Sequence, residues 1–200
     1  MSLTILQPSE GPLISIEEAK TYLRVDTDAE NDLITRLIAA STEALEMITG
    51  RSFLQKTYQY ITHVTPETSS FPYFKNFPSV LQIPLPRPPM QRIVSVTLKT
   101  QLQDQEIPPE NYKTFESHGP TQLTVTLPGS LCPAQDPMAL LISFIAGWSE
   151  TAQGVPEPLR LATLMLIADA YEKRDGYSAQ GGLPLGVSSL IQPYRLINLW

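Results

Sequence analysis

The spacing of apolar side chains changes twice along the chain. Apolar residues recur every three or four positions from about residue 15 to 50, and they alternate with polar residues from about 52 to 147. The helical spacing returns after Gly154. A period of 3.6 is typical of amphipathic helices and a period of two is typical of half-buried strands. The pattern therefore predicts an α+β fold, in which the N- and C-terminal segments form a helical bundle and the middle forms an inserted antiparallel β-sheet or sandwich.

The first part, residues 1–51, predicts a helical hairpin. In ISIEEAKTYLRVD, residues 14–26, Ser15 and Glu18 have the spacing of a capping box, in which each side chain binds a free amide of the first turn. The second helix, DLITRLIAASTEALEMIT, ends at Gly50, a residue suited to the left-handed C-terminal position.

Two adjacent apolar stripes run along the second helix. One contains Leu33, Leu37, Ala40, Ala44 and Ile48, and the other contains Ile34, Ile38, Ser41 and Leu45. Together they are broader than one contact requires, so we expect this helix to be buried against more than one neighbour.

The second part, residues 52–154, predicts the inserted β region. Turn-forming stretches rich in proline, such as PLPRPP and IPPEN, separate segments of alternating polarity. Six segments are expected to be strands: KTYQYITHV, VLQIPL, RIVSVTLKT, NYKTFE, QLTVTLPG and ALLISFIAGW. Short strands joined by polar turns favour antiparallel pairing.

The third part, residues 155–186, predicts a C-terminal helix that enters after Pro156 and Pro158. Its apolar stripe and those of the hairpin each need a partner, so we expect the two chain ends to pack together. The predicted helical core consists of Leu23, Leu33, Leu37, Ile38, Leu45, Ile48, Leu164, Leu166 and Tyr171.

The last part, residues 187–200, is more apolar than a terminus exposed to water should be. This segment either returns to the core of its own chain or docks on another protein, and the pattern alone favours neither. The residues concerned are Leu190, Ile191, Tyr194, Arg195, Leu196, Leu199 and Trp200.

Composition narrows the class of protein. The net charge of −6 argues against a protein that grips DNA through its phosphates, although not against one that lets DNA pass. Cys132 is the only cysteine, so we expect no disulfide within the chain and a reducing compartment such as the cytoplasm. The sequence contains no apolar run of membrane-spanning length, and we expect no membrane partner.

The candidate sites for chemistry are weak. Asp26, Asp28 and Glu30 alternate as calcium ligands do, but Asn31 stands where the loop needs glycine and Leu37 where it needs glutamate. Helix capping explains these acids better. His63, His118 and Cys132 form no recognisable triad and fall short of a zinc ligand set. We therefore expect no catalytic site, no metal and no cofactor.

The order of these segments resembles that of the head–tail connector (adaptor) proteins of long-tailed double-stranded DNA bacteriophages and prophages, in a subgroup with a β insertion. The resemblance rests on SIEEAKTYLRVD, LITRLIAASTEALEMITGRSF, PLPRPPMQRIVSVTL, PENY, FIAGW, VPEPLRLATLMLIADAYEKRDG and LIQPYRLINLW. Trp148 stands where such proteins are expected to carry tyrosine.

The resemblance implies a structural virion protein without enzymatic activity. Such proteins form a ring, typically dodecameric, under the portal protein at the head–tail junction, after assembly in the host cytoplasm. The ring extends the DNA channel and offers a surface to the stopper, or tail-completion, protein, while DNA passes without specific binding. For residues 187–200, the resemblance favours docking on the portal over return to the core.

Two alternatives belong to other classes. A ring-forming DNA-packaging component, similar to a small terminase subunit, would be favoured by a basic helix-turn-helix, and the sequence contains none. A small hydrolase would require polar residues that converge in a pocket.

The acidic composition predicts that the purified protein does not bind duplex DNA at physiological salt. Few cations are available to displace counterions from the phosphates, so no salt-sensitive attraction should develop. Fluorescence anisotropy with a labelled duplex would measure this, and a submicromolar affinity would favour the packaging alternative.

Overall fold

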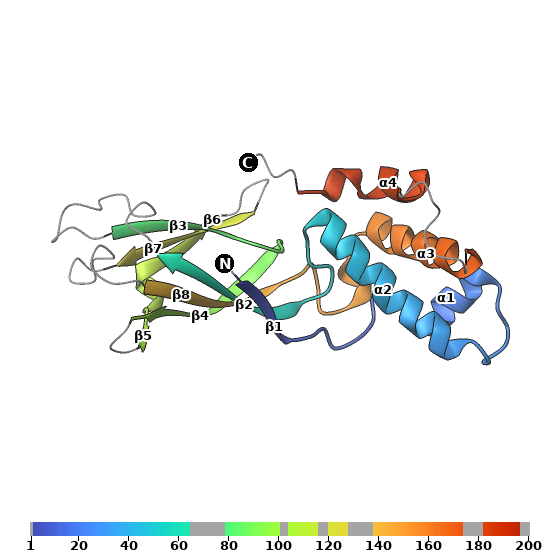
Figure 1. Ribbon diagram of the computed structural model, residues 1–200, viewed down its shortest axis with the longest axis horizontal. Helices are drawn as coiled ribbons and strands as arrows, with labels where there is room; N and C mark the ends of the chain where they lie inside the picture. The colour runs from blue at the N-terminus through green and yellow to red at the C-terminus, as the bar shows by residue number, and fades with distance from the viewer. Residues whose placement is uncertain are drawn as a thin grey trace. The chain divides into compact units, whose positions relative to one another are not determined.

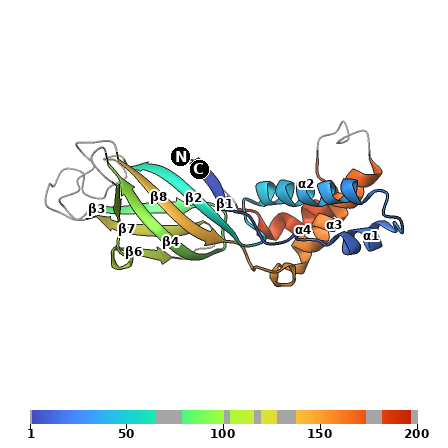
Figure 2. The same cartoon turned by 90° about the horizontal axis from the view of Figure 1, so that it is seen from below.

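The chain folds into two compact units. The computed structural model describes residues 2–64, 79–100, 104–115, 120–127, 138–173 and 182–196 (Figures 1 and 2). The strand unit contains residues 1–8 and 56–147, and the helical unit contains residues 9–55 and 148–200. Helices and antiparallel sheets occupy the predicted parts of the sequence, which confirms the α+β prediction. His118, Cys132, Leu199 and Trp200 lie outside the described residues.

The helical unit consists of four α-helices: α1 (Ile16–Leu23), α2 (Asn31–Thr49), α3 (Glu157–Glu172) and α4 (Leu185–Ile191). Two short 3-10 turns, η3 (Ala152–Gly154) and η4 (Gln192–Tyr194), also belong to it. α3 contacts α1, α2 and α4. The N-terminal hairpin and the C-terminal helix therefore pack together, as their apolar stripes predict.

The N-terminus of α1 and the C-termini of α1 and α2 have capping geometries typical of helix ends. The hydroxyl of Ser15 accepts a hydrogen bond from the amide of Glu18 at 3.1 Å. α1 ends at Arg24 with φ 58° and α2 ends at Gly50 with φ 72°, so both termini use the left-handed conformation. The other arm of the capping box differs, because the Glu18 carboxylate binds Arg160 on α3 instead.

The buried stripe of α2 is the one that contains Ile34, Ile38 and Leu45. Of the residues expected in the core, Ile38, Leu45, Leu164 and Leu166 are buried, whereas Leu23, Leu37, Ile48 and Tyr171 are partly buried at its margin. Leu33 is 39% exposed and lies outside the core, contrary to expectation. One residue turns an α-helix by about 100°, so burying Ile34 directs Leu33 away from α3.

The strand unit contains two antiparallel sheets. Five strands form the first sheet in the order β1-β2-β8-β4-β5, and three form the second in the order β3-β7-β6. The first comprises β1 (Ser2–Gln7), β2 (Lys56–Val64), β8 (Met138–Ala146), β4 (Met90–Lys99) and β5 (Asp104–Glu106). The second comprises β3 (Ser79–Leu85), β7 (Thr121–Leu127) and β6 (Tyr112–Phe115), which follows a 3-10 turn, η2 (Pro109–Asn111).

Both sheets contribute one face to a common core, which makes this unit a sandwich. Every second residue of β7 and β8 is buried, as the alternating pattern predicts. The β7 side chains Leu123 and Val125 and the β8 side chains Ile142 and Phe144 belong to one cluster. Tyr58 of β2 stacks on Phe144 with ring centroids 5.7 Å apart.

All six predicted strands are present, but the sequence pattern did not indicate β1 or β5. Residues 1–51 were expected to belong together, whereas Met1–Pro8 belongs to the strand unit. β1 pairs with β2, and Ser2 lies opposite Ile61 in that pairing. A six-residue strand whose partner follows some 50 residues later has no local turn signal, so only the tertiary pairing identifies it.

The contrast between the two stripes of α2 can be measured. Leu45 is fully buried, so we expect Leu45→Ala to lower the free energy of unfolding by about 2–5 kcal/mol through lost burial and a cavity. Leu33→Ala is the matched control on the same helix, and at protein concentrations where the chain is monomeric it should lower the free energy by much less than Leu45→Ala, since it leaves no cavity in the core. Urea unfolding followed by circular dichroism provides both values, and equal losses would contradict this assignment of the core.

Candidate assembly surfaces

The C-terminal segment folds onto the helical unit through α4. Val187 and Ile191, one turn apart on this helix, are 0% and 1% exposed. Gly186 allows close approach to α3, because a Cβ atom at this position would lie 2.5 Å from Cε of Met165. The face of α4 that carries Val187 and Ile191 is therefore part of the core of the unit.

The residues after α4 bind the C-terminal end of α2. The amide of Leu196 donates to the carbonyl oxygen of Thr49 at 2.9 Å, and its side chain lies against Gly50. Nε of Arg51 donates to the carbonyl oxygen of Tyr194 at 2.6 Å. The first bond satisfies the carbonyl group of Thr49 at the end of α2, and the two bonds together hold residues 194–196 in place.

A ring cluster around Trp148 supports the same segment. The Trp148 ring lies 6.2 Å from the Phe53 ring and 6.1 Å, edge to face, from the Tyr194 ring. The Arg51 guanidinium lies over the indole, 5.7 Å from its centroid, and burial lowers the pKa of Arg51. These aromatic and cation–π contacts hold Tyr194, the last residue of η4, against the helical unit.

The residues expected to dock on the portal thus divide into three groups. Ile191 is buried, and Leu190, Tyr194 and Leu196 are partly buried within their own unit. Arg195 is exposed, and Leu199 and Trp200 lie outside the described residues. Ile191 cannot meet a partner while α4 stays on α3, because its side chain is already covered. Docking on the portal stays a prediction, and it concerns Arg195 and the residues that follow.

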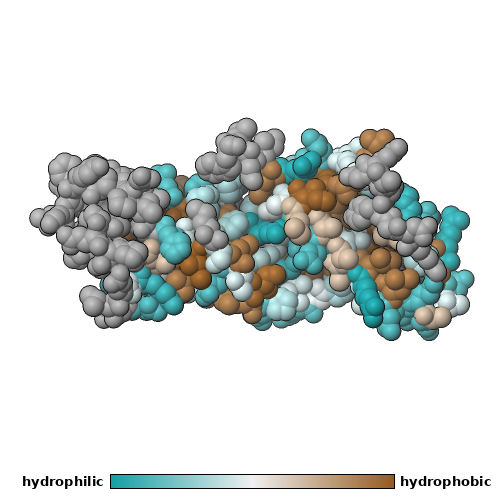
Figure 3. Space-filling view, in the orientation of Figure 1, coloured by the Kyte–Doolittle hydropathy of each residue, from teal (hydrophilic) through white to brown (hydrophobic). Residues whose placement is uncertain are grey.

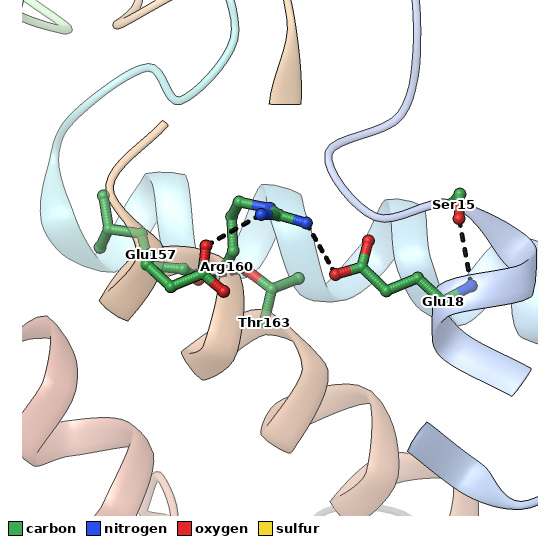
Figure 4. A network of polar contacts seen from close by, with 6 residues as sticks. Ser15, Glu18, Glu157, Arg160 and Thr163 are labelled. Atoms are coloured by element: carbon green, nitrogen blue, oxygen red, sulfur yellow. Dashed lines mark hydrogen bonds and ion pairs between the residues drawn. The ribbon is translucent and has the colours of Figure 1, made fainter. Parts of the chain in front are cut away.

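Polar contacts connect α3 to the N-terminal hairpin near both of its ends. Nη2 of Arg160 lies 2.7 Å from Glu18 Oε1 on α1, and Nη1 lies 2.9 Å from Glu157 Oε2 (Figure 4). Near the other end, the Tyr171 hydroxyl donates to the Glu30 carboxylate just before α2. The Arg160 side chain is 16% exposed, so its bond to Glu18 is screened less than a surface ion pair.

The acidic loop between α1 and α2 is explained by ion pairing and capping. Asp28 accepts from Lys20 at 2.7 Å and from the Asn31 side-chain amide at 3.2 Å. The bond from Lys20 lowers the pKa of Asp28. Beside this loop is an open depression of about 600 Å³, lined by residues that include Glu17, Lys20, Arg24, Asp26 and Asp28.

No cluster suited to metal binding occurs among the described residues, where no three His, Cys, Asp or Glu side chains converge. His63 is exposed on β2. None of the helices in the described ranges is both long and apolar enough to cross a membrane.

The outward face of α2 carries a second feature, which we name the α2 seam. Its five residues follow one another at spacings of three and four, as in the seam of a coiled coil: Leu33, Arg36, Ala40, Glu43 and Met47. All five are exposed, and Met47 is 66% exposed. Hydrophobic atoms interrupt the hydrophilic surface where Figure 1 draws α2 (Figure 3). α2 contacts both α1 and α3, which confirms the prediction of more than one neighbour, but no element in the described ranges covers the α2 seam.

Charge is distributed unevenly between the units. The helical unit contains eight Lys and Arg side chains against fourteen Asp and Glu, and the strand unit contains six of each kind. The residues of the helical unit therefore account for the whole net charge of −6, and those of the strand unit carry a net charge of zero.

Residues 13–77 match the family model described as phage gp6-like head-tail connector protein. The matched range includes α1, α2 and β2. No individually curated protein matches the chain.

Three solved structures share the fold over the whole chain. A chain from the neck of an empty gene transfer agent (GTA) particle, computed with C6 symmetry, is 19% identical with a TM-score of 0.76. A chain from the virion of a native particle is 16% identical with a TM-score of 0.75. A third, from the neck of a native particle computed with C12 symmetry, is 18% identical with a TM-score of 0.74. Each match covers 100% of this chain and 98% of the other.

The burial of α4 predicts a large effect of one substitution. Val187→Asp places an unpaired carboxylate between α4 and α3, so we expect it to lower the free energy of unfolding by about 3 kcal/mol or more. Ser189→Asp introduces the same side chain at an exposed position of the same helix, and it should change the value by no more than about 0.5 kcal/mol. Urea unfolding measures both. A neutral Val187→Asp would show that the segment is dispensable to the fold.

Proposed function

We propose that the chain belongs to the phage gp6-like head–tail connector family, whose model matches residues 13–77, and that it forms a ring at the neck of a phage-like particle, between the head and the tail. The observation that carries this proposal is the combination of the family match over residues 13–77 with a fold shared along the full chain with neck proteins. Joining a head to a tail is a structural role, so the proposal includes no enzymatic activity.

A closed ring requires two different contact surfaces on each subunit, because neighbours in a cyclic assembly meet head to tail. Exposed apolar side chains are available for such contacts in both units. In the helical unit these include Tyr22, Leu161 and Leu185, at 43%, 38% and 87% exposure. In the strand unit, the edge strand β1 exposes Ile5 and Leu6 by 51% and 53%. The C12 symmetry of one similar neck structure supports a ring of twelve copies, and the C6 symmetry of another is compatible with that number.

The charge of the chain suits a passage for DNA. Lysine and arginine side chains that pair with phosphates would hold the duplex by releasing counterions. The strand unit is balanced and the helical unit is acidic, so neither sequence offers the basic excess that retention would require. A ring of such subunits would extend the channel of the portal without binding the DNA that moves through it.

Two partners follow from a place between head and tail. We assign the portal contact to Arg195 and the residues after it, including Leu199 and Trp200, because the preceding part of the segment is occupied by its own core. The opposite surface of the ring would receive the stopper protein. The packaging-component and hydrolase alternatives receive no support from the family match or from the described residues.

Electron microscopy of particles made without this protein tests the proposal. We expect heads filled with DNA, together with detached tails, because packaging precedes the joining step that the ring performs. Expression of the chain in trans should restore tailed particles. Heads that remain empty would favour a packaging role, and normally tailed particles would contradict a place in the neck.

A further inference from the structure

Among the residues that the structure describes, no element covers the α2 seam. Leu33 and Met47 are 39% and 66% exposed, and Ala40 between them is exposed as well. These three residues are seven positions apart, which places them on one line along the helix. Apolar side chains aligned in this way favour contact with a second helix rather than with water.

The two charged residues of the seam have opposite signs. Arg36 and Glu43 lie seven residues apart on the same edge of this line, too far along the helix to pair with each other. Neither forms an ion pair with any residue in the described ranges. The seam therefore offers one positive and one negative group for charges on a partner.

The seam is complementary to itself when one copy is reversed. If two α2 helices lie antiparallel about a two-fold axis beside Ala40, Leu33 of each copy faces Met47 of the other. The same operation places Arg36 of each copy opposite Glu43 of the other, because both residues lie on one edge of the seam. The small side chains of the two Ala40 residues meet at the axis and let the helices approach closely.

We propose that the free subunit forms a two-fold symmetric dimer through the α2 seam, with a second copy of this chain as the partner. One two-fold rotation produces both the apolar pairs and the pairs of opposite charge. Because the seam is complementary to itself in both respects, we identify the partner as a second copy of the chain. The proposal does not depend on the ring. A cyclic ring cannot contain this contact between neighbours, since all of its subunits point the same way along the axis. The dimer is thus a state of the unassembled protein that covers Leu33 and Met47.

Charge reversal tests the pairing, with sedimentation velocity over a range of protein concentrations as the measurement. Arg36→Glu places two glutamates opposite each other at both ends of the contact, and Glu43→Arg does the same with two arginines. We expect each single variant to raise the dimer dissociation constant by roughly tenfold or more. The double variant Arg36→Glu/Glu43→Arg should return it to within a fewfold of the original value. Glu172→Arg, an exposed charge reversal on α3, is the matched control and should have no effect.

Cross-linking provides a second readout that does not depend on the charges. In a Cys132→Ser background, Ala40→Cys places two thiols beside the two-fold axis, and we expect a disulfide-linked dimer under mild oxidation. Thr35→Cys, which is exposed on another face of α2, should remain uncross-linked. A monomer at all concentrations, a dimer insensitive to both single reversals, or equal cross-linking at the two positions would overturn the proposal.

Discussion

The helical unit depends on the burial of α3 among helices from both ends of the chain. Leu159, Ala162 and Ile167 are fully buried. The buried side chains of α3 lie on several sides of the helix instead of forming one stripe. A helix that is apolar on most sides must be covered from several directions. α1 and α2 precede the strand unit in sequence and α4 follows α3, so the unit is complete only when both chain ends meet.

This arrangement explains how a chain can interrupt one unit with another. The entropic cost of closing a loop rises only slowly with its length, so a long insertion between α2 and α3 is tolerated when it buries its own core. The strand unit does this, because its two sheets share a cluster of buried side chains. Polar bonds then give α3 a defined position against the hairpin, since burial by itself has little directionality. Arg160 and Tyr171 supply these bonds near the two ends of the helix.

The same packing determines which surfaces remain for assembly. α4 covers α3 and residues 194–196 cover the end of α2, so the C-terminal segment completes the subunit before it can serve a partner. α2 keeps one side towards α3 and leaves the other to solvent. Exposed apolar side chains such as those of the α2 seam favour association, so this seam affects the solubility of the free subunit as well as any assembly that it forms.

The sequence by itself determined the types of the main elements and their order, because the periods of 3.6 and two are local properties of neighbouring residues. Three helices and six strands could be predicted for this reason, and so could the left-handed residue Gly50. Only the tertiary structure decided which of the two α2 stripes is buried, since Leu33 and Ile34 are equally apolar and α3 selects between them. It also paired β1 with β2, gave Glu18 a partner 142 residues away, and returned Ile191 to the core. Each of these outcomes is a contact between segments distant in sequence, which no local pattern contains.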